Sequence, residues 1–326
     1  MKVKKLLKIG VGALLYLAGG FRVPQRVPIL TYHSIDTTGS EMSVFPGDFE
    51  QQMAYLKRKG YKVISLQDFY GRYLGLKTGG QRLVVITFDD GYKNNFEHAF
   101  PILRKFDFPA SVFVVTSCVG GKPKWLNEVI ADLEDFCRHN QAKKESVCSS
   151  KERHSFLKSL PQLKLKLEIE ALKKIADFPM LDWVEIGEMS KGLISFYSHS
   201  STHPHLIELT DSQVDQELRV SNEILEEKLG KRAEFFCYPY GSHSPRTESL
   251  VRAAGFAGAC ALDEDWDSAC EDPFSLKRIP IRKSSFGLLE FKFKLSRAYL
   301  RYQELRRTLR FVQARFISVD VVAGQR

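Results

Sequence analysis

The segment Leu83–Phe88 constrains the fold of this 326-residue chain more than any other part of it. It is a continuous apolar and β-branched run, which is typical of a strand buried on both faces of a sheet. Asp89, Asp90 and Gly91 follow it directly. Two adjacent carboxylates after a buried strand are costly unless they bind a cation or share protons. A plain Asp-Asp-Gly turn is the alternative.

Runs of this kind alternate with helical segments along the chain. Strands are expected at residues 28–32, 61–65, 83–88, 110–116, 194–198, 234–238, 256–261 and 276–281, and helices at 49–60, 94–106, 211–229 and 250–255. This alternation predicts βα units and a parallel sheet, and the number of strands favours a barrel over an open sheet. Residues 126–178 are charged and helical in pattern, with 143–151 the most loop-like. We therefore expect residues 122–185 to be an insertion that covers one side of the barrel.

A second polar cluster, His199-Ser200-Ser201-Thr202-His203, follows the predicted strand 194–198. Two imidazoles four residues apart can converge on one metal ion if the segment makes a helical turn, which Pro204 would then stop. His205 leaves an extended alternative open, because His203 and His205 alternate as residues of a strand do.

A third cluster, at residues 236–241, is a strand end that runs into Pro239, Tyr240 and Gly241. Backbone N–H groups of such a loop can bind a developing oxyanion. All three clusters fall at the carboxyl ends of predicted strands, which is where barrel enzymes place their active sites.

Taken together and in this order, the three clusters resemble the polysaccharide deacetylase family, the NodB-homology group also known as carbohydrate esterase family 4. The resemblance covers about residues 27–285. Further stretches similar to the bacterial exopolysaccharide branch of the family lie at residues 28–33, 109–113 and 276–280. The resemblance implies a distorted (β/α)7-type, TIM-like barrel over residues 26–286, with the helical insertion 122–185 inside it.

The resemblance also implies a set of site residues. Asp90, His199 and His203 would bind a divalent metal, with Zn²⁺ expected and Co²⁺, Ni²⁺ or Mn²⁺ as alternatives. Asp89 would be the general base, and the Tyr240 backbone N–H would help to stabilise the oxyanion. Two imidazoles and one carboxylate leave positions open for water and substrate, as in catalytic zinc sites. The implied reaction is hydrolysis of N-acetyl groups on an N-acetylhexosamine-containing bacterial polysaccharide, which releases acetate.

Two departures from the family pattern concern the catalytic groups. An arginine that the family often has two residues before the proline of its third motif is Cys237 here. Arg278 is a candidate to supply the guanidinium, and a surface arginine is the alternative. No histidine follows His243, so the family's late Leu-x-His motif is absent. His33, which ends the first strand, is proposed as the substitute acid or as a substrate contact, with a structural histidine as the alternative.

The expected substrate-binding residues are Pro239 and Trp266. The late aromatic motif of the family is represented only by Asp265-Trp266. Trp266 either lines the binding groove or belongs to a lid that has no catalytic part.

The net charge of +9 lies at the two ends of the chain. Residues 1–26 and residues 289–316 each carry +6 and the last ten residues are neutral, which leaves −3 for the body. An acidic body argues against a nucleic-acid-binding protein, which needs a basic face. The ends point instead to contact with a membrane surface.

Residues 1–25 are lysine-rich and then apolar, as in a signal or membrane-anchor segment, and a soluble amphipathic helix is the alternative. We therefore expect an exported, periplasmic or cell-envelope protein. Residues 287–326 form a basic tail with a helical apolar stripe, which would pack on the body or lie on an anionic membrane. The six cysteines permit either disulfides or buried thiols.

Two other functions remain open at this stage. One is deacylation of a lipid-linked sugar at the membrane. The other is carbohydrate binding by a degenerate barrel without activity, although Asp89, Asp90, His199 and His203 are all present.

Overall fold

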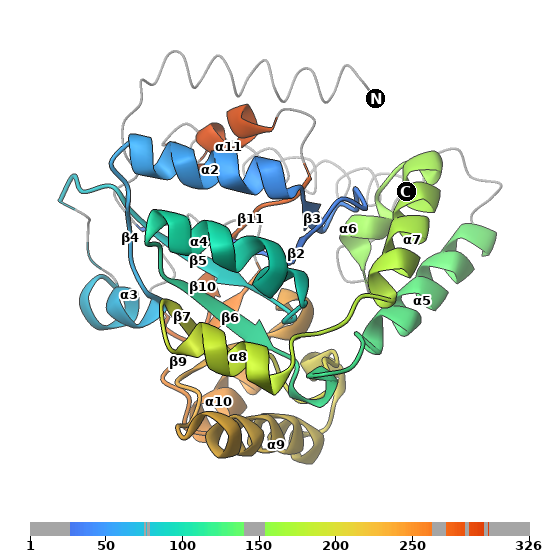
Figure 1. Ribbon diagram of the computed structural model, residues 1–326. Helices are drawn as coiled ribbons and strands as arrows, with labels where there is room; N and C mark the ends of the chain where they lie inside the picture. The colour runs from blue at the N-terminus through green and yellow to red at the C-terminus, as the bar shows by residue number, and fades with distance from the viewer. Residues whose placement is uncertain are drawn as a thin grey trace, which may run out of the picture.

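The computed structural model describes residues 27–74, 76, 79–139, 154–262, 272–283, 287–296 and 299. Within these ranges one parallel sheet forms the centre of the molecule, in the order β10-β9-β8-β7-β6-β5-β1-β11 (Figure 1). Its strands are β1 (Ile29–Tyr32), β5 (Leu83–Phe88), β6 (Ala110–Val114), β7 (Ile194–Ser198), β8 (Phe235–Cys237), β9 (Gly258–Ala261), β10 (Leu276–Lys277) and β11 (Ile279–Pro280). The sheet begins and ends in one segment of chain, since only Arg278 separates β10 from β11. The barrel is therefore nearly closed, and the predicted α/β barrel is confirmed.

Helices surround this barrel. They are α2 (Pro46–Arg58), α3 (Leu66–Arg72), α4 (Phe100–Phe106), α8 (Trp183–Ser190), α9 (Asp211–Leu229), α10 (Pro245–Ala253) and α11 (Leu288–Lys294). The predicted bounds of α9 are confirmed, and local chemistry explains them. Thr210 and Gln213 form a capping box at its start, and Gly230 ends it with a φ of 72°.

Several local predictions are wrong in their bounds. The last strand, predicted at 276–281, is broken at Arg278 because its first half pairs with β9 and its second half with β1. The helix predicted at 250–255 begins at Pro245, because the preceding Ser244 caps it. The helix predicted at 94–106 begins as a π-helix over Asn95–Ala99 and continues as α4.

Three short strands lie outside the strand order given above; one pairs with β5, and the other two form a small separate sheet. β4 (Lys62–Val63) pairs with the start of β5, and β2 (Ser34–Ile35) pairs with β3 (Ser43–Val44) beside the end of β1. The sequence analysis did not predict β2, β3 or α3, because each of these elements is too short to show a periodic pattern.

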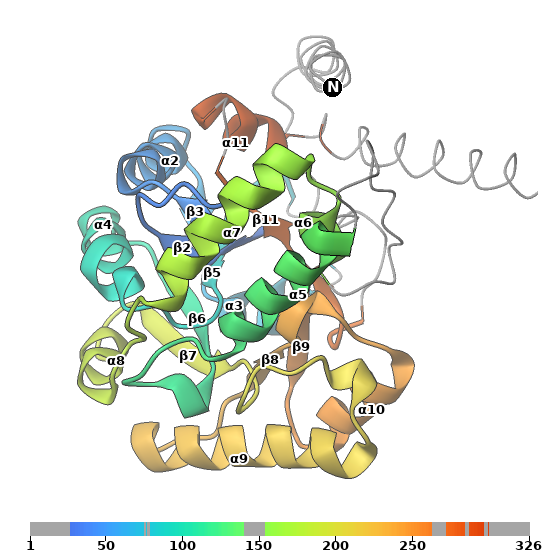
Figure 2. The same cartoon turned by 90° about the vertical axis from the view of Figure 1, so that its right-hand side faces the viewer.

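The predicted insertion contains α5 (Trp125–His139), α6 (Ser155–Lys158) and α7 (Gln162–Ala176). Figure 2 shows these helices in front of the barrel, inside the ring formed by α2, α4, α8, α9 and α10. They share a second hydrophobic cluster with barrel loops, which we call the insertion core. It consists of Tyr92, Val115, Cys118, Trp125, Leu126, Val129, Ile130, Leu133, Leu157, Leu160, Leu165, Ile169, Leu172, Ile175 and Met180. The insertion is therefore packed firmly onto the barrel mouth.

No helix in the described ranges is long and apolar enough to cross a bilayer. The predicted signal or anchor segment, residues 1–25, lies outside those ranges, as do residues 300–326 of the basic tail. Four cysteines in the described part of the chain are free thiols, namely Cys118, Cys137, Cys237 and Cys260. Cys148 and Cys270 lie outside it.

Candidate metal centre and active site

A tight turn after β5 brings Asp89 and Asp90 to the barrel mouth. Asp90 has a φ of 74° and Gly91 a φ of 86°, so both residues adopt the left-handed conformation. A Cβ atom on Gly91 would lie 2.9 Å from the side chain of Val114, so only glycine fits there without displacing its neighbour. Both carboxylates are almost fully buried, which requires partners for each.

Two imidazoles converge on Asp90. The Nε2 atoms of His199 and His203 lie 3.4 Å and 3.5 Å from the same oxygen, Asp90 Oδ1. Burial raises the pKa of Asp90, but hydrogen bonds from the two histidines outweigh it and hold that pKa well below its usual value.

The segment from His199 to His203 does not make the helical turn that would bring the histidines together. Ser200 and His203 have φ values of 65° and 67°, and the His203 N–H donates to Ser200 Oγ at 2.9 Å. The backbone N–H groups of Ser201 and Thr202 both donate to Glu217 on α9. The histidines therefore converge through a side-chain-stabilised loop, which the sequence spacing did not indicate.

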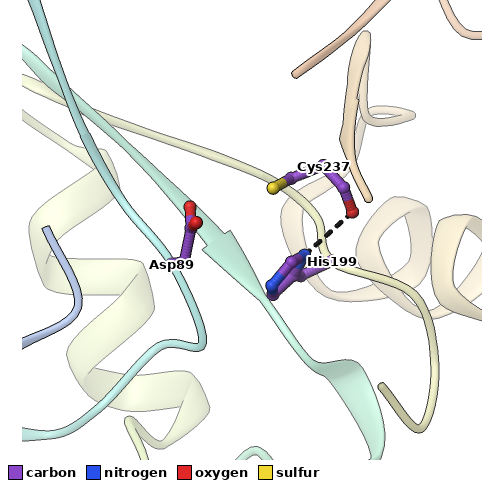
Figure 3. A group of neighbouring side chains, drawn as sticks. All are labelled: Asp89, His199 and Cys237. Carbon is purple, nitrogen blue, oxygen red and sulfur yellow. Dashed lines mark hydrogen bonds between the residues drawn. The ribbon is translucent and has the colours of Figure 1, made fainter. Parts of the chain in front are cut away.

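The chemistry of this donor set fits a divalent metal. The Nδ1 atom of His199 lies 2.8 Å from the Cys237 carbonyl oxygen, and a carbonyl can only accept (Figure 3). The Nε2 atom of a neutral His199 consequently carries a lone pair that faces Asp90 Oδ1. Positive charge is needed between these two electron-rich atoms, and a proton or a metal ion supplies it.

A second group of metal-ligand type consists of Asp89, His199 and Cys237 (Figure 3). Arg278 already occupies it. Its guanidinium donates to both Asp89 oxygens at 2.7 Å and to Cys237 Sγ at 3.0 Å. A cation there would be repelled by the guanidinium, so Asp90, His199 and His203 form the better metal site.

Arg278 is completely buried inside the barrel, so the surface-arginine alternative is wrong. Besides Asp89 it donates to the Ala261 carbonyl and to the hydroxyls of Thr31 and Thr87. Burial raises the pKa of Asp89, but the Arg278 guanidinium outweighs burial and lowers it. Asp89 is therefore held as a carboxylate in a fixed orientation.

His33 lies beside Asp89. Its Nε2 atom is 3.8 Å from Asp89 Oδ2, and its backbone carbonyl accepts from Asn95 Nδ2 at 2.9 Å. Burial lowers the pKa of His33, which favours the neutral imidazole.

Tyr240 and Pro239 lie in a 3₁₀ turn, Pro239–Gly241, beside His203. The Tyr240 ring is 4.5 Å from the His203 ring at an angle of 70°. A Cβ atom on Gly241 would lie 2.2 Å from Leu262 Cβ, so the close approach of the two loops requires glycine. Trp266 lies outside the described residues.

Comparison with known proteins now decides the family, since the sequence matches the polysaccharide deacetylase profile over residues 76–259. The chain belongs to the polysaccharide deacetylase family. This confirms the predicted family and the predicted enzyme class, a hydrolase that acts on carbon–nitrogen bonds other than peptide bonds.

YxkH of Bacillus subtilis is 22% identical over 264 residues, covering 81% of this chain and 74% of that protein. The poly-beta-1,6-N-acetyl-D-glucosamine N-deacetylase of Staphylococcus aureus is 24% identical over 256 residues, covering 75% of this chain and 69% of that protein. The solved structure of IcaB from Ammonifex degensii has a TM-score of 0.59 and 20% identity, covering 84% of this chain and 99% of that one. The last similarity agrees with the barrel fold of the family.

Two residues that contact this candidate site were not predicted from the sequence. One contacts His203 and the other Asp90. Trp125, from the insertion, stacks on His203 with a centroid distance of 4.5 Å and an angle of 26°. Tyr92 is buried, and burial together with a hydrogen bond to Asp90 raises its pKa. Tyr92 follows the Asp-Asp-Gly turn and could have been suspected for that reason, whereas no signal in the insertion marks Trp125.

Proposed function

We propose that this chain is a metal-dependent N-deacetylase that hydrolyses acetamide groups on an N-acetylhexosamine-containing bacterial polysaccharide and releases acetate. One observation carries the proposal. Two imidazoles converge on Asp90, while the adjacent Asp89 is held as a carboxylate by a buried arginine. This arrangement supports a metal site at Asp90 with a general base, Asp89, beside it at the barrel mouth.

Asp90, His199 and His203 would hold the metal. A divalent ion bound there supplies Lewis acidity for a carbonyl oxygen and lowers the pKa of water. We expect Zn²⁺, because one carboxylate and two imidazoles are common zinc ligands and leave coordination positions open.

Asp89 accepts the proton of the attacking water. Its bidentate contact with Arg278 fixes both oxygens and keeps the group ionised at neutral pH. A new C–O bond then forms at the acetamide carbonyl carbon, and the C–N bond breaks as the amine nitrogen takes up a proton. In this proposal His33, whose Nε2 atom lies 3.8 Å from Asp89 Oδ2, is the group that gives a proton to the leaving nitrogen.

The loop that contains Pro239 and Tyr240 supplies the oxyanion and substrate contacts in this proposal. The ring of Tyr240 packs against His203, which brings the turn Pro239–Gly241 next to the proposed metal ligands, and the Tyr240 backbone N–H is the proposed oxyanion donor of that turn. Trp266 remains a predicted substrate contact.

The substrate assignment draws on the similarity to the Staphylococcus aureus poly-beta-1,6-N-acetyl-D-glucosamine N-deacetylase. Export and membrane attachment are also part of the proposal. They rest on the lysine-rich and apolar residues 1–25 and on the basic tail 287–326. Fractionation of cells that express the full chain tests this location.

Acetate release from an N-acetylglucosamine oligomer tests the reaction. We expect activity to be lost with a chelator, in Asp89→Asn and in His199→Ala. His98→Ala serves as a matched control, because His98 is exposed on the π-helix and should leave turnover unchanged. Activity that persists in all three conditions would overturn the proposal, and activity only on a lipid-linked sugar would reassign the substrate.

A further inference from the structure

The two histidines of the metal-ligand set differ in what holds their rings. His199 donates from Nδ1 to the Cys237 carbonyl, the usual arrangement for a histidine that binds metal through Nε2. Within the part of the chain that the structure describes, His203 has no such partner, because its Nδ1 atom is buried and makes no hydrogen bond there. With Nε2 directed at Asp90 and no hydrogen bond at Nδ1, packing must fix the far side of the His203 ring.

Two aromatic rings take that place. Trp125 lies nearly parallel to the His203 ring at 4.5 Å and 26°, and Tyr240 meets it edge-on at 4.5 Å and 70°. Trp125 and His203 are both buried, with 6% and 5% of their surface exposed. The imidazole is thus confined on a face and on an edge, which limits rotation of the ring away from Asp90.

Trp125 is the first residue of α5 and belongs to the insertion core, which also contains Tyr92 beside Asp90. Tyr240 packs against the same cluster. The Trp125 ring is therefore placed against His203 by the first turn of α5, where the insertion meets the barrel mouth.

We infer that Trp125 is a positioning residue for the metal centre: its ring replaces the missing hydrogen bond of His203 and orients Nε2 toward the ion. The inference rests on the proposed function, since it requires a metal at Asp90, His199 and His203. The insertion is then a structural part of the metal site as well as a cover for one side of the barrel.

Metal affinity of the full chain tests this inference directly. Zn²⁺ affinity is measured by competition with a chromophoric chelator, and the ligand geometry by the visible absorption of the Co²⁺-loaded protein. In Trp125→Leu we expect Zn²⁺ affinity to fall about tenfold or more, as is typical when the partner of a ligating histidine is lost. The Co²⁺ spectrum should change as well. Trp125→Phe keeps a flat ring and should restore both properties.

Leu133→Ala is the matched control. Leu133 is fully buried in the same insertion core on the same helix, but it has no ring against His203. It should lower the melting temperature while leaving the Zn²⁺ affinity and the Co²⁺ spectrum unchanged. If Trp125→Leu does not fold, Trp125→Met removes the ring with a more adaptable side chain.

The possible results separate the two proposals. Wild-type affinity in the Leu or Met variant, or an equal loss in Leu133→Ala, would overturn the role of Trp125 and leave the proposed function intact. Absence of Zn²⁺ binding in the wild type, or unchanged binding in His203→Ala, would instead overturn the metal site itself.

Discussion

Asp89 and His203 lie in the same site but are held by different forces from different parts of the chain. Asp89 is held inside the barrel by charge and hydrogen bonds, through Arg278 and the hydroxyl of Thr31. His203 is held from the insertion side by the packing of aromatic rings. The barrel half of the site is therefore a fixed polar network, and the insertion half depends on how well one apolar cluster packs on another.

The largest expected effect is on the barrel half and concerns catalysis. Asp89→Asn removes the proposed base but keeps a side chain of the same size. We expect kcat to fall about 10³-fold, within the range of general acid–base catalysis. Zn²⁺ affinity should stay close to that of the wild type, whereas Asp90→Asn should lose it. Acetate release and chelator competition measure the two quantities, and an Asp89→Asn enzyme with wild-type turnover would rule out this role.

The next effect concerns the stability of the same network. Arg278→Ala leaves the buried Asp89 carboxylate without its counter-charge, so the free energy of unfolding should fall by about 3–5 kcal/mol. Urea denaturation measures this loss. Arg219→Ala is the control, since the exposed Arg219–Glu223 pair on α9 should contribute less than about 1 kcal/mol. Equal losses of unfolding free energy in the two variants would contradict a larger contribution from the buried pair.

A smaller effect is expected where the two halves meet, at the loop of Tyr240. Gly241→Ala would place a Cβ atom 2.2 Å from Leu262 Cβ at a φ of 68°, which should cost about 2 kcal/mol and lower kcat by displacing Tyr240. Gly230→Ala is the matched control, because Gly230 has nearly the same φ. The φ there is 72° but nothing lies within 4 Å of the added atom, so only the conformational cost of about 1 kcal/mol remains. Loss of kcat in Gly230→Ala would argue against a specific effect of the loop.

The smallest effect is on the insertion half and depends on pH. Glu168 on α7 accepts from Ser40 Oγ at 2.5 Å and from the Glu41 N–H at 2.8 Å, and burial raises its pKa above the usual 4.5. Glu168 therefore binds its proton more tightly in the folded state. Its stabilising contribution is complete below about pH 4.5 and is lost as the pH rises through the raised value.

Glu168→Gln should remove this dependence. Relative to the variant, the wild type should lose stability between pH 4 and pH 7, by less than about 1.5 kcal/mol. Thermal unfolding of both proteins across this range measures the difference. A wild type that gains stability relative to Glu168→Gln over the same range would contradict the expected sign.

The fold and the candidate site could be predicted from the sequence only where local patterns determine them. Strong local patterns predicted β5, β7 and α9 with their observed bounds. The polar clusters at strand ends also predicted correctly that Asp89, Asp90, His199 and His203 lie close together. Arg278 was a candidate from the sequence, but its burial against Asp89 could be seen only in three dimensions. The break between β10 and β11 comes from pairing with two strands distant in sequence, and no local pattern encodes it. Trp125 was missed because its stacking partner is far away in the chain and the insertion carries no family motif.

The placement of Arg278 between β10 and β11 has a consequence for how the protein matures. The segment that closes the barrel against β1 is also the segment that neutralises Asp89. While the chain is being synthesised, β1 has an open edge and Asp89 has no counter-charge until residues 276–280 have emerged. Completion of the sheet and neutralisation of the Asp89 carboxylate are therefore one late event, and a product truncated before this segment would have neither.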